Sequence, residues 1–183
     1  MSARLFAALD VPAEVRDALA AFGRAAAEDD FALRPVGEDA LHVTLAFLGH
    51  RAIDEIEPAR EAVRAAAGPV PELELGDVLW LSPRRPHVLT IEVLDPAGAL
   101  GLLQASISAA LVDAIGYEPE RRPFRPHITV ARVRRGASPR RHGLPGAPGA
   151  RFAGEAVTLY RSWLGGGPAR YEPLSSVPLG TLS

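Results

Sequence analysis

The sequence predicts an α+β domain of two antiparallel sheets with helices on the outside, built from two similar halves. Strand-like and helix-like segments alternate along the 183 residues. Each half of the chain also contains a helix, then an extended linker, then a strand with the pattern His-apolar-Thr-apolar. The length of 183 residues suits a single well-packed domain, or two small lobes that share one interface.

The first half supplies two strands and two helices. Residues 4–9 are a short apolar strand. Residues 13–29 repeat apolar side chains every three to four positions, which predicts a helix. A strand follows over residues 41–48 and a second helix over residues 53–67, where Pro58 is tolerated only in the first turn.

The second half begins with two strands over residues 72–81 and 87–94, joined as a hairpin by the turn sequence SPRRP. Asp95 and Pro96 suit the cap and first position of a third helix, which Gly116 ends.

The last part of the chain returns to strands. We expect a strand over residues 128–133 and a surface loop over residues 136–149, which are rich in Gly, Pro and Arg. Strands over residues 157–164 and 170–179 form a closing pair around the sequence GGGP.

Composition excludes several classes of protein. The chain has no cysteine, so disulfides and thiolate chemistry are excluded. No apolar run approaches the roughly 20 residues that span a bilayer. The opening MSARLFAALDVP carries an acid soon after a short apolar run, which indicates a strand rather than a signal peptide. We expect a cytoplasmic monomer without a membrane partner.

Charge is distributed unevenly along a chain of net charge −2. Residues 121–154 contain nine arginines and no acid, whereas residues 54–77 contain seven acids and two arginines. The basic stretch could meet phosphates, although a solvated loop explains it equally well. Its candidate arginines in the loop are Arg134, Arg135, Arg140 and Arg141.

Other arginines and the tryptophans receive plainer interpretations. We expect Arg84 and Arg85 to be exposed at the tip of the predicted hairpin. We expect Trp80 and Trp163, both within predicted strands, to form core or cleft wall rather than platforms for bases.

The repeated motif carries the main functional signal, in the segments LHVTLAFLG and PHITVAR. Strand alternation puts His42 and Thr44 on one face, and His127 and Thr129 likewise. The same alternation puts Phe47 on the opposite, apolar face. If the two strands adjoin, or face each other across a cleft, four polar groups converge.

A converging histidine pair suits acid-base catalysis. Histidine titrates near neutral pH, so one ring can accept a proton while the other donates one. Threonine hydroxyls can donate hydrogen bonds to phosphate oxygens that gain charge. One such motif is ordinarily structural, but two copies in corresponding places favour catalysis, by in-line displacement at phosphorus. A zinc site would need a third protein ligand, which neither motif supplies, so we expect no metal and no cofactor.

These residues resemble a known family. HVTLAFLG and HITVAR are similar to the two HxTx signatures of the 2H phosphoesterases, in particular of the RNA 2′,3′-cyclic phosphodiesterase branch, also described as 2′-5′ RNA ligase-like. The segments RLFAALDVP and PFRPHITVAR also fall in family order. The resemblance implies that residues 1–183 form a single bilobal domain, in which two pseudo-symmetric lobes of antiparallel sheet with outer helices surround a central cleft. It also implies that no metal is used, and that a terminal 2′,3′-cyclic phosphate is hydrolysed to a 2′-phosphomonoester.

The resemblance also implies roles for individual residues. His42 would be the proton donor to the 3′-oxygen leaving group and His127 the proton acceptor that activates water, an assignment that the sequence by itself leaves open. Thr44 and Thr129 would bind the phosphate.

Three further residues are candidate substrate contacts: Arg132, Phe47 and Arg125. Arg132 matches an arginine of the family, and Phe47 an aromatic residue that could stack on a base. Strand alternation opposes both, because it turns Arg132 away from His127 and Phe47 towards the core.

Alternative functions stay open at this point. A 2H phosphoesterase could act on small cyclic nucleotides, or on 2′-5′ linkages, including RNA ligation. A non-catalytic RNA-binding protein could use the motifs only to hold a ligand. The intact histidines favour an enzyme, whose partners would be RNA ends or a small nucleotide.

Overall fold

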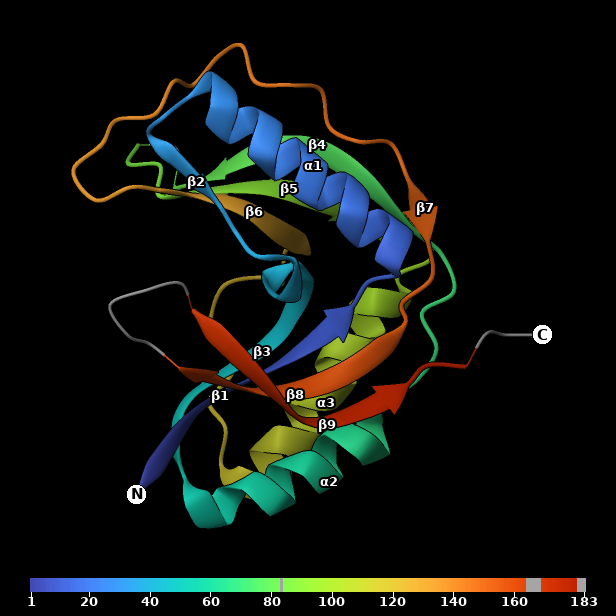
Figure 1. The fold of residues 1–183 in the computed structure, drawn as a ribbon. Helices are drawn as coiled ribbons and strands as arrows, with labels where there is room; N and C mark the ends of the chain where they lie inside the picture. Colours follow the sequence, from blue (N-terminus) through green and yellow to red (C-terminus); the bar gives the residue numbers. More distant parts are fainter. Residues whose placement is uncertain (83, 164–168, 181–183) are drawn as a thin grey trace.

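A computed structural model describes residues 1–82, 84–163 and 169–180 of the chain, which form two lobes of antiparallel sheet (Figure 1). Along the hydrogen-bonded path the strands follow the order β7-β4-β5-β6-β3-β1-β8-β9, and β2 pairs with β6. The upper lobe in Figure 1 contains β4 (Leu73–Leu81), β5 (Val88–Leu94), β6 (His127–Val133), β7 (Arg151–Phe152) and β2 (Leu33–Pro35). The lower lobe contains β3 (His42–Ala52), β1 (Ser2–Asp10), β8 (Ala156–Trp163) and β9 (Arg170–Pro178).

Among the described residues, β3 and β6 pair at one position, Val43 opposite Ile128, and this bridge joins the sheets of the two lobes. Each is the middle residue of its His-x-Thr motif, and both are fully buried. The predicted α+β fold with two lobes is confirmed. This pair joins the strands of both lobes into one hydrogen-bonded order. The two motif strands meet at the centre of the molecule and diverge on either side of it.

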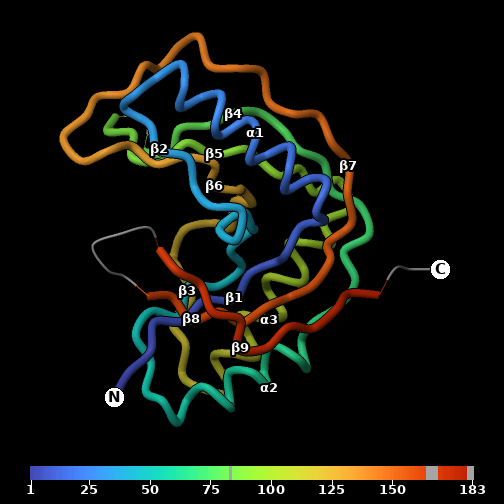
Figure 2. The backbone as a smooth tube through the Cα atoms, in the orientation of Figure 1, coloured from blue at the N-terminus to red at the C-terminus, as the bar shows by residue number. Residues whose placement is uncertain are grey.

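The helices are exchanged between the lobes. Helix α1 (Ala13–Asp29) follows β1 of the lower lobe but packs on β2 and β6 of the upper lobe. Helix α3 (Ala99–Ile115) follows β5 of the upper lobe but packs on β3 of the lower lobe, beside α2 (Ile56–Ala66). The backbone trace in Figure 2 makes both crossings visible. Each His-x-Thr strand is therefore backed by the helix that precedes the other one.

A single hydrophobic cluster runs through both lobes and their helices. Leu9, Val43, Ile107 and Ile128 are among its members with no exposed surface. Burial of one such side chain stabilises the fold by roughly 1.5–3 kcal/mol. The cluster holds the two motif strands from behind, so that their polar faces are left towards the space between the lobes.

Most predicted elements are found, with some shifted boundaries. The helix over residues 13–29 and the two long hairpin strands lie where the pattern predicts them. The helix predicted over residues 53–67 divides into a 3-10 turn (Ile53–Glu55) and α2, with Pro58 in the first turn.

The predicted start of the third helix is wrong. The helix begins at Ala99 after Gly98 in a left-handed conformation, so Asp95 is not its cap and Pro96 is not its first residue. Asp95 reaches the helix from a preceding turn instead, where its Oδ2 accepts a hydrogen bond of 2.9 Å from the N–H of Gly101. The short strands β2 and β7 and the 3-10 turn Glu38–Ala40 were not predicted, because each is too brief to have a period.

One residue of the predicted turn SPRRP, Pro83, lies outside the described residues, and so does the whole of the predicted GGGP turn together with Leu164 before it. Within the described residues, no helix combines the length and the apolar character needed to cross a membrane.

Candidate active site

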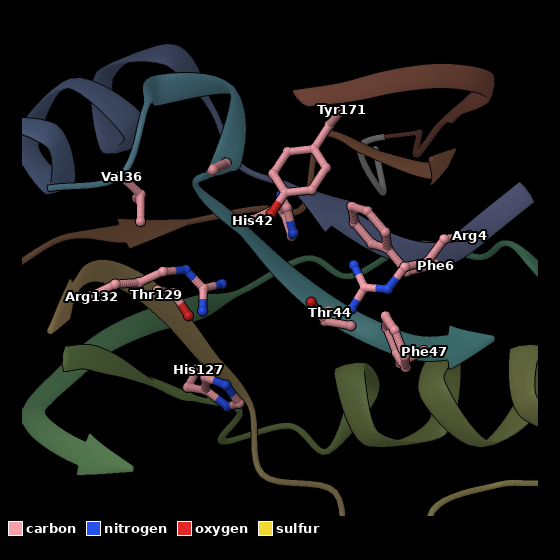
Figure 3. Close-up of a pocket in the computed structure, with 11 residues that line it drawn as sticks. Arg4, Phe6, Val36, His42, Thr44, Phe47, His127, Thr129, Arg132 and Tyr171 are labelled. Atoms are coloured by element: carbon pink, nitrogen blue, oxygen red, sulfur yellow. The ribbon is translucent and has the colours of Figure 1, made fainter. Parts of the chain in front are cut away.

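Both His-x-Thr motifs line one cavity of about 190 Å³ between the lobes (Figure 3). His42 and Thr44 come from β3, and His127 and Thr129 from β6. The convergence that the repeated motif predicts is therefore present. The remaining lining residues are Arg4, Phe6, Val36, Ala40, Phe47, Arg132 and Tyr171.

The register relates the two motifs by a local two-fold axis. Val43 pairs with Ile128 in an antiparallel sense. His42, Thr44, His127 and Thr129 all line the same cavity, so the four polar groups of the motifs face a shared space.

A β-bulge interrupts each motif strand at the same position, three residues after the histidine. The pairing of β3 with β1 passes over Leu45, and the pairing of β6 with β5 passes over Val130. A bulge puts one extra residue into a strand, so the alternation of faces is reversed beyond it. Both strands accordingly have two consecutive buried residues, Leu45-Ala46 and Val130-Ala131.

The bulges correct the orientation expected for two side chains. Alternation turned Phe47 towards the core and Arg132 away from His127, but both lie five residues after their histidines and beyond the bulge. Phe47 is 39% exposed and Arg132 is exposed, and both line the cavity. The first half therefore presents an aromatic ring where the second presents a guanidinium (Figure 3).

The exchanged helices support the bulges. The carbonyl of Leu45 accepts a hydrogen bond of 3.2 Å from Nε2 of Gln104 on α3. The carbonyl of Val130 accepts one of 3.1 Å from the N–H of Val36. Helix α1 approaches this carbonyl so closely that a Cβ added at Gly23 would lie 2.7 Å from its oxygen. Only glycine fits there without displacing the strand.

His42 lies among aromatic rings. Its ring stacks on Phe6 at 5.0 Å and on Tyr160 at 5.7 Å, and meets the ring of Tyr171 edge-on at 5.6 Å. Burial lowers the pKa of His42 from 6.5 to about 4, a hydrogen bond to the backbone of Asp39 opposes this, and the charge of Arg132 adds to it. The imidazole is therefore neutral at neutral pH in the free protein.

The half-buried carboxylate of Asp10 accepts a hydrogen bond from Tyr160, one of the rings that stack on His42. The Tyr160 hydroxyl donates to Oδ1 of Asp10 at 2.8 Å, and the Thr158 hydroxyl donates to Oδ2 at 2.6 Å. Burial raises the pKa of Asp10, and these two hydrogen bonds and the charge of Arg16 oppose the rise. Asp10 is also paired with His42 across β1 and β3. It therefore positions His42 in two ways, through this strand pairing and through the Tyr160 ring that stacks on the imidazole.

His127 has a different environment. Its Nδ1 lies 2.7 Å from the carbonyl oxygen of Arg125, so an N–H on Nδ1 donates to that oxygen. This hydrogen bond leaves Nε2 to interact with a ligand in the cavity. Within the described part of the chain, no aromatic ring stacks on His127.

Two arginines give the cavity a positive charge. Arg4 donates to the Ser162 hydroxyl at 2.9 Å, and its guanidinium lies 4.5 Å from the centre of the Phe47 ring. Neither Arg4 nor Arg132 forms an ion pair with an acid that the structure describes. Among the described residues, no Asp or Glu lines the cavity, so it suits an anion.

The other candidates named from the sequence have varied positions. Arg125 lines a neighbouring cavity with His127, and its carbonyl is the partner of that histidine. Trp80 packs against the core as expected, whereas Trp163 is 46% exposed, lies under Arg161 and is not part of the core. The described residues contain no group of three His, Asp or Glu side chains that could hold a metal ion.

Sequence patterns missed four side chains at the site: Arg4 and Phe6 on β1, Tyr160 on β8 and Tyr171 on β9. The two tyrosines are more than a hundred residues from His42 in sequence and belong to no motif. Arg4 and Phe6 do share one face of a predicted strand, which was the only available signal.

Comparison with known proteins gives consistent matches over nearly the whole chain. Residues 11–162 match the sequence model of the 2′-5′ RNA ligase superfamily. A protein of Escherichia coli strain K12 named RNA 2′,3′-cyclic phosphodiesterase is 34% identical over 184 residues, which cover 93% of each chain.

Solved structures agree with the fold. A Thermus thermophilus protein, TT0787, superposes with a TM-score of 0.83 at 27% identity, covering 96% of this chain and 97% of that one. Escherichia coli LigT in complex with 3′-AMP superposes with a TM-score of 0.78 at 29% identity, covering 98% and 99% of the two chains.

Proposed function

This chain belongs to the 2′-5′ RNA ligase superfamily, which is part of the 2H phosphoesterases, and we propose that it hydrolyses the 2′,3′-cyclic phosphate at the end of an RNA to a 2′-phosphomonoester. The observation that carries this proposal is the meeting of both His-x-Thr motifs in one cavity, where the described lining includes two arginines and no acid. A cyclic phosphodiester is an anion that breaks by proton transfer at two oxygens, and these groups suit both requirements.

In the proposed reaction, His127 accepts a proton from water, whose oxygen attacks phosphorus in line with the 3′-oxygen. The bond from phosphorus to the 3′-oxygen breaks, and His42 donates a proton to that oxygen. The hydrogen bond from Nδ1 of His127 to Arg125 supports the acceptor role, because it leaves Nε2 for the water. The reaction needs only groups of the protein and uses no metal.

The donor role of His42 requires proton uptake when the substrate binds. The free imidazole has a pKa of about 4 and is neutral at pH 7. A phosphodiester anion beside it favours the charged ring and raises its pKa. If binding is coupled to proton uptake, His42 can donate a proton only in the enzyme–substrate complex. This requirement makes the assignment of His42 as the donor testable.

The remaining groups would bind the substrate. Thr44 and Thr129 would donate hydrogen bonds to the non-bridging phosphate oxygens, and Arg132 would stabilise the charge that develops on them. Phe47 would stack on the terminal base, with its other side under Arg4. Arg125 would contact the substrate from the neighbouring cavity.

The test is hydrolysis, in excess EDTA, of a short RNA with a 2′,3′-cyclic phosphate end by the wild type, His42→Ala and His127→Ala. We expect activity that persists in EDTA, yields a 2′-phosphate and collapses in both variants. A 3′-phosphate product would exclude the proposed leaving group, and EDTA sensitivity would exclude the metal-free reaction.

A cyclic mononucleotide is the second candidate substrate, because the related LigT was solved with 3′-AMP bound. Comparison of kcat/KM for uridine 2′,3′-cyclic phosphate and for the RNA separates the two candidates. A higher value for the mononucleotide would favour the small nucleotide.

A further inference from the structure

We propose that single-stranded RNA binds along a second, basic groove, so that the strand body lies there while its 3′ end occupies the catalytic cavity. The inference rests on the proposed function, since it assigns the route by which an RNA substrate reaches the histidines. We call this surface the arginine groove and define it by Arg84, Arg85, Arg134, Arg135 and Arg141.

The arginine groove is a cavity of about 570 Å³ where the β4–β5 hairpin meets the segment after β6. All five arginines are exposed, and no Asp or Glu of the described chain lines the groove. None of the five forms an ion pair with an acid among residues 1–82, 84–163 and 169–180. By contrast, Arg64 and Arg151 elsewhere on the surface pair with glutamates. The charge of the groove is therefore left for a ligand.

Hydrogen bonds fix the walls of the groove. Nη2 of Arg141 donates to the carbonyl of Arg84 at 3.4 Å, which joins the segment after β6 to the hairpin. Nε of Arg134 donates to the carbonyl of Phe31 at 3.0 Å, so its terminal nitrogens are left for a ligand. The N–H of Arg140 donates to Oδ2 of Asp30 at 2.6 Å, which ties the same segment to the end of α1.

Shared lining residues relate the arginine groove to the catalytic cavity through two intermediate cavities. The catalytic cavity shares Thr44, Phe47 and His127 with a neighbouring cavity of about 580 Å³. That neighbour reaches Ser82, which lines a third cavity together with His87 and the two hairpin arginines. The third cavity shares His87 and both hairpin arginines with the arginine groove.

The sizes favour a polymer. The catalytic cavity, at about 190 Å³, is smaller than the roughly 300–1,000 Å³ of sites that enclose a drug-sized ligand, so it holds the cyclic phosphate and little more. The rest of the substrate must extend along the neighbouring cavities. A cyclic mononucleotide has no second phosphate for the arginine groove, whereas an oligonucleotide has one per nucleotide. Guanidinium groups bind such phosphates in a bidentate manner.

Binding of a ten-nucleotide RNA that carries a 5′ fluorophore and a 2′-phosphate end tests the groove without needing catalysis. Fluorescence anisotropy would compare the wild type with Arg135→Ala/Arg141→Ala and with the control Arg64→Ala/Arg151→Ala, which removes the same charge from the paired surface arginines. We expect the groove variant to lose about tenfold or more in affinity at low salt and the control to change less than about twofold. The slope of log K against log salt should fall by about 1.4, at about 0.7 per lost contact.

Hydrolysis assays complete the test. The groove variant should raise KM for the decamer with a cyclic end and leave kcat/KM for uridine 2′,3′-cyclic phosphate within about twofold of wild type. Unchanged affinity and salt slope in the groove variant would overturn the inference, as would an equal loss with the mononucleotide. Displacement of the RNA by an acidic peptide at equal charge concentration would also overturn it, in favour of a protein partner. If the wild type cleaves neither substrate but decamer binding still depends on the groove, the proposed function fails and the RNA site stands.

Discussion

The two halves of the active site have the same backbone and different surroundings. Both motif strands are bulged three residues after the histidine, and both histidines bond to a nearby backbone carbonyl. His42 nevertheless lies among three aromatic rings, whereas His127 stacks on none that the structure describes. An acid pairs with each histidine across the sheet, but Asp10 accepts two side-chain hydrogen bonds while Glu92 accepts none from the described residues.

This difference suggests how one repeated motif can supply two chemical roles. The backbone repeat brings two identical groups to one point. The strands outside the motif, β1, β8 and β9, then make one imidazole neutral and enclosed. The position five residues after the histidine differs in the same way, with Phe47 in one half and Arg132 in the other.

The largest expected effect is the loss of either histidine, which tests whether the halves are equally necessary. His42→Ala and His127→Ala should each lower kcat by about 10²–10⁴ or more, because each removes one proton transfer. The double variant should be no more than about tenfold slower than the worse single variant, since the two transfers belong to one reaction. Single-turnover hydrolysis of the cyclic RNA end measures this. Retention of activity by either single variant would break the assignment of paired roles.

Substitutions of Arg132 and Phe47, the two cavity residues beyond the bulges, should change different kinetic constants. Arg132→Ala should lower kcat by about 10²–10³, as loss of a charge-stabilising donor does. Phe47→Ala should instead raise KM by about tenfold and leave kcat nearly unchanged, because stacking on a base is worth about 1–3 kcal/mol. Arg132→Lys would restore the charge without the forked geometry and should recover only part of the rate. A kcat loss in Phe47→Ala equal to that in Arg132→Ala would remove the distinction.

The enclosure of His42 should appear as a pH dependence of stability. Between pH 6.5 and about 4 the unfolded chain binds a proton at His42 and the folded protein does not. The free energy of unfolding should therefore decrease as pH falls through this window, by about 3 kcal/mol at about 1.4 kcal/mol per pH unit. Urea unfolding of the wild type and of His42→Gln at several pH values isolates the contribution of His42 to the pH dependence of the free energy of unfolding. The variant should lack this contribution. Tyr160→Phe retains the stacked ring and should keep the pH dependence.

The same histidine can be followed by NMR with and without a bound nucleotide 2′-phosphate. We expect the anion to raise the pKa of His42 above about 4, as the donor role requires. A pKa that stays near 4 in the complex would exchange the roles, with His127 as donor.

The smallest expected effects concern the supports of the two bulges. Gly23→Ala adds a Cβ 2.7 Å from the Val130 oxygen, so the strand or helix must move, and we expect a loss of about 1–3 kcal/mol in stability and a lower kcat through Arg132. Gln104→Met removes the hydrogen bond to the Leu45 carbonyl and should cost about 1 kcal/mol, with a raised KM through Phe47. Gly101→Ala on α3, where a Cβ meets nothing nearer than 3.7 Å, is the control. Equal kinetic effects of the first two variants would argue against separate supports.

Much of the fold and the centre of the site follow from sequence patterns, because they depend on local period and on a repeated motif. Helix 13–29 and the convergence of His42 with His127 are examples. The orientations of Phe47 and Arg132 failed, because simple alternation ignores a bulge. The apolar pairs Leu45-Ala46 and Val130-Ala131 break the alternation in both motifs and could have revealed it.

The aromatic surroundings of His42 could not be predicted in the same way. Phe6, Tyr160 and Tyr171 come from three strands that meet only through long-range pairing. The lowered pKa of His42 arises from this enclosure, so it too depends on the tertiary structure. Local patterns identify the reactive groups here, whereas the strands around them determine how those groups differ.

The exchange of α1 and α3 has a consequence for folding. If the chain were cut between the halves, α1 would lose β6 and α3 would lose β3, and each fragment would expose the strand face that the helix of the other fragment now covers. The arrangement is an intramolecular counterpart of domain swapping, in which two units exchange an equivalent element. We therefore expect one cooperative unfolding transition rather than two, and amide hydrogens of both lobes that exchange with solvent at the same limiting free energy.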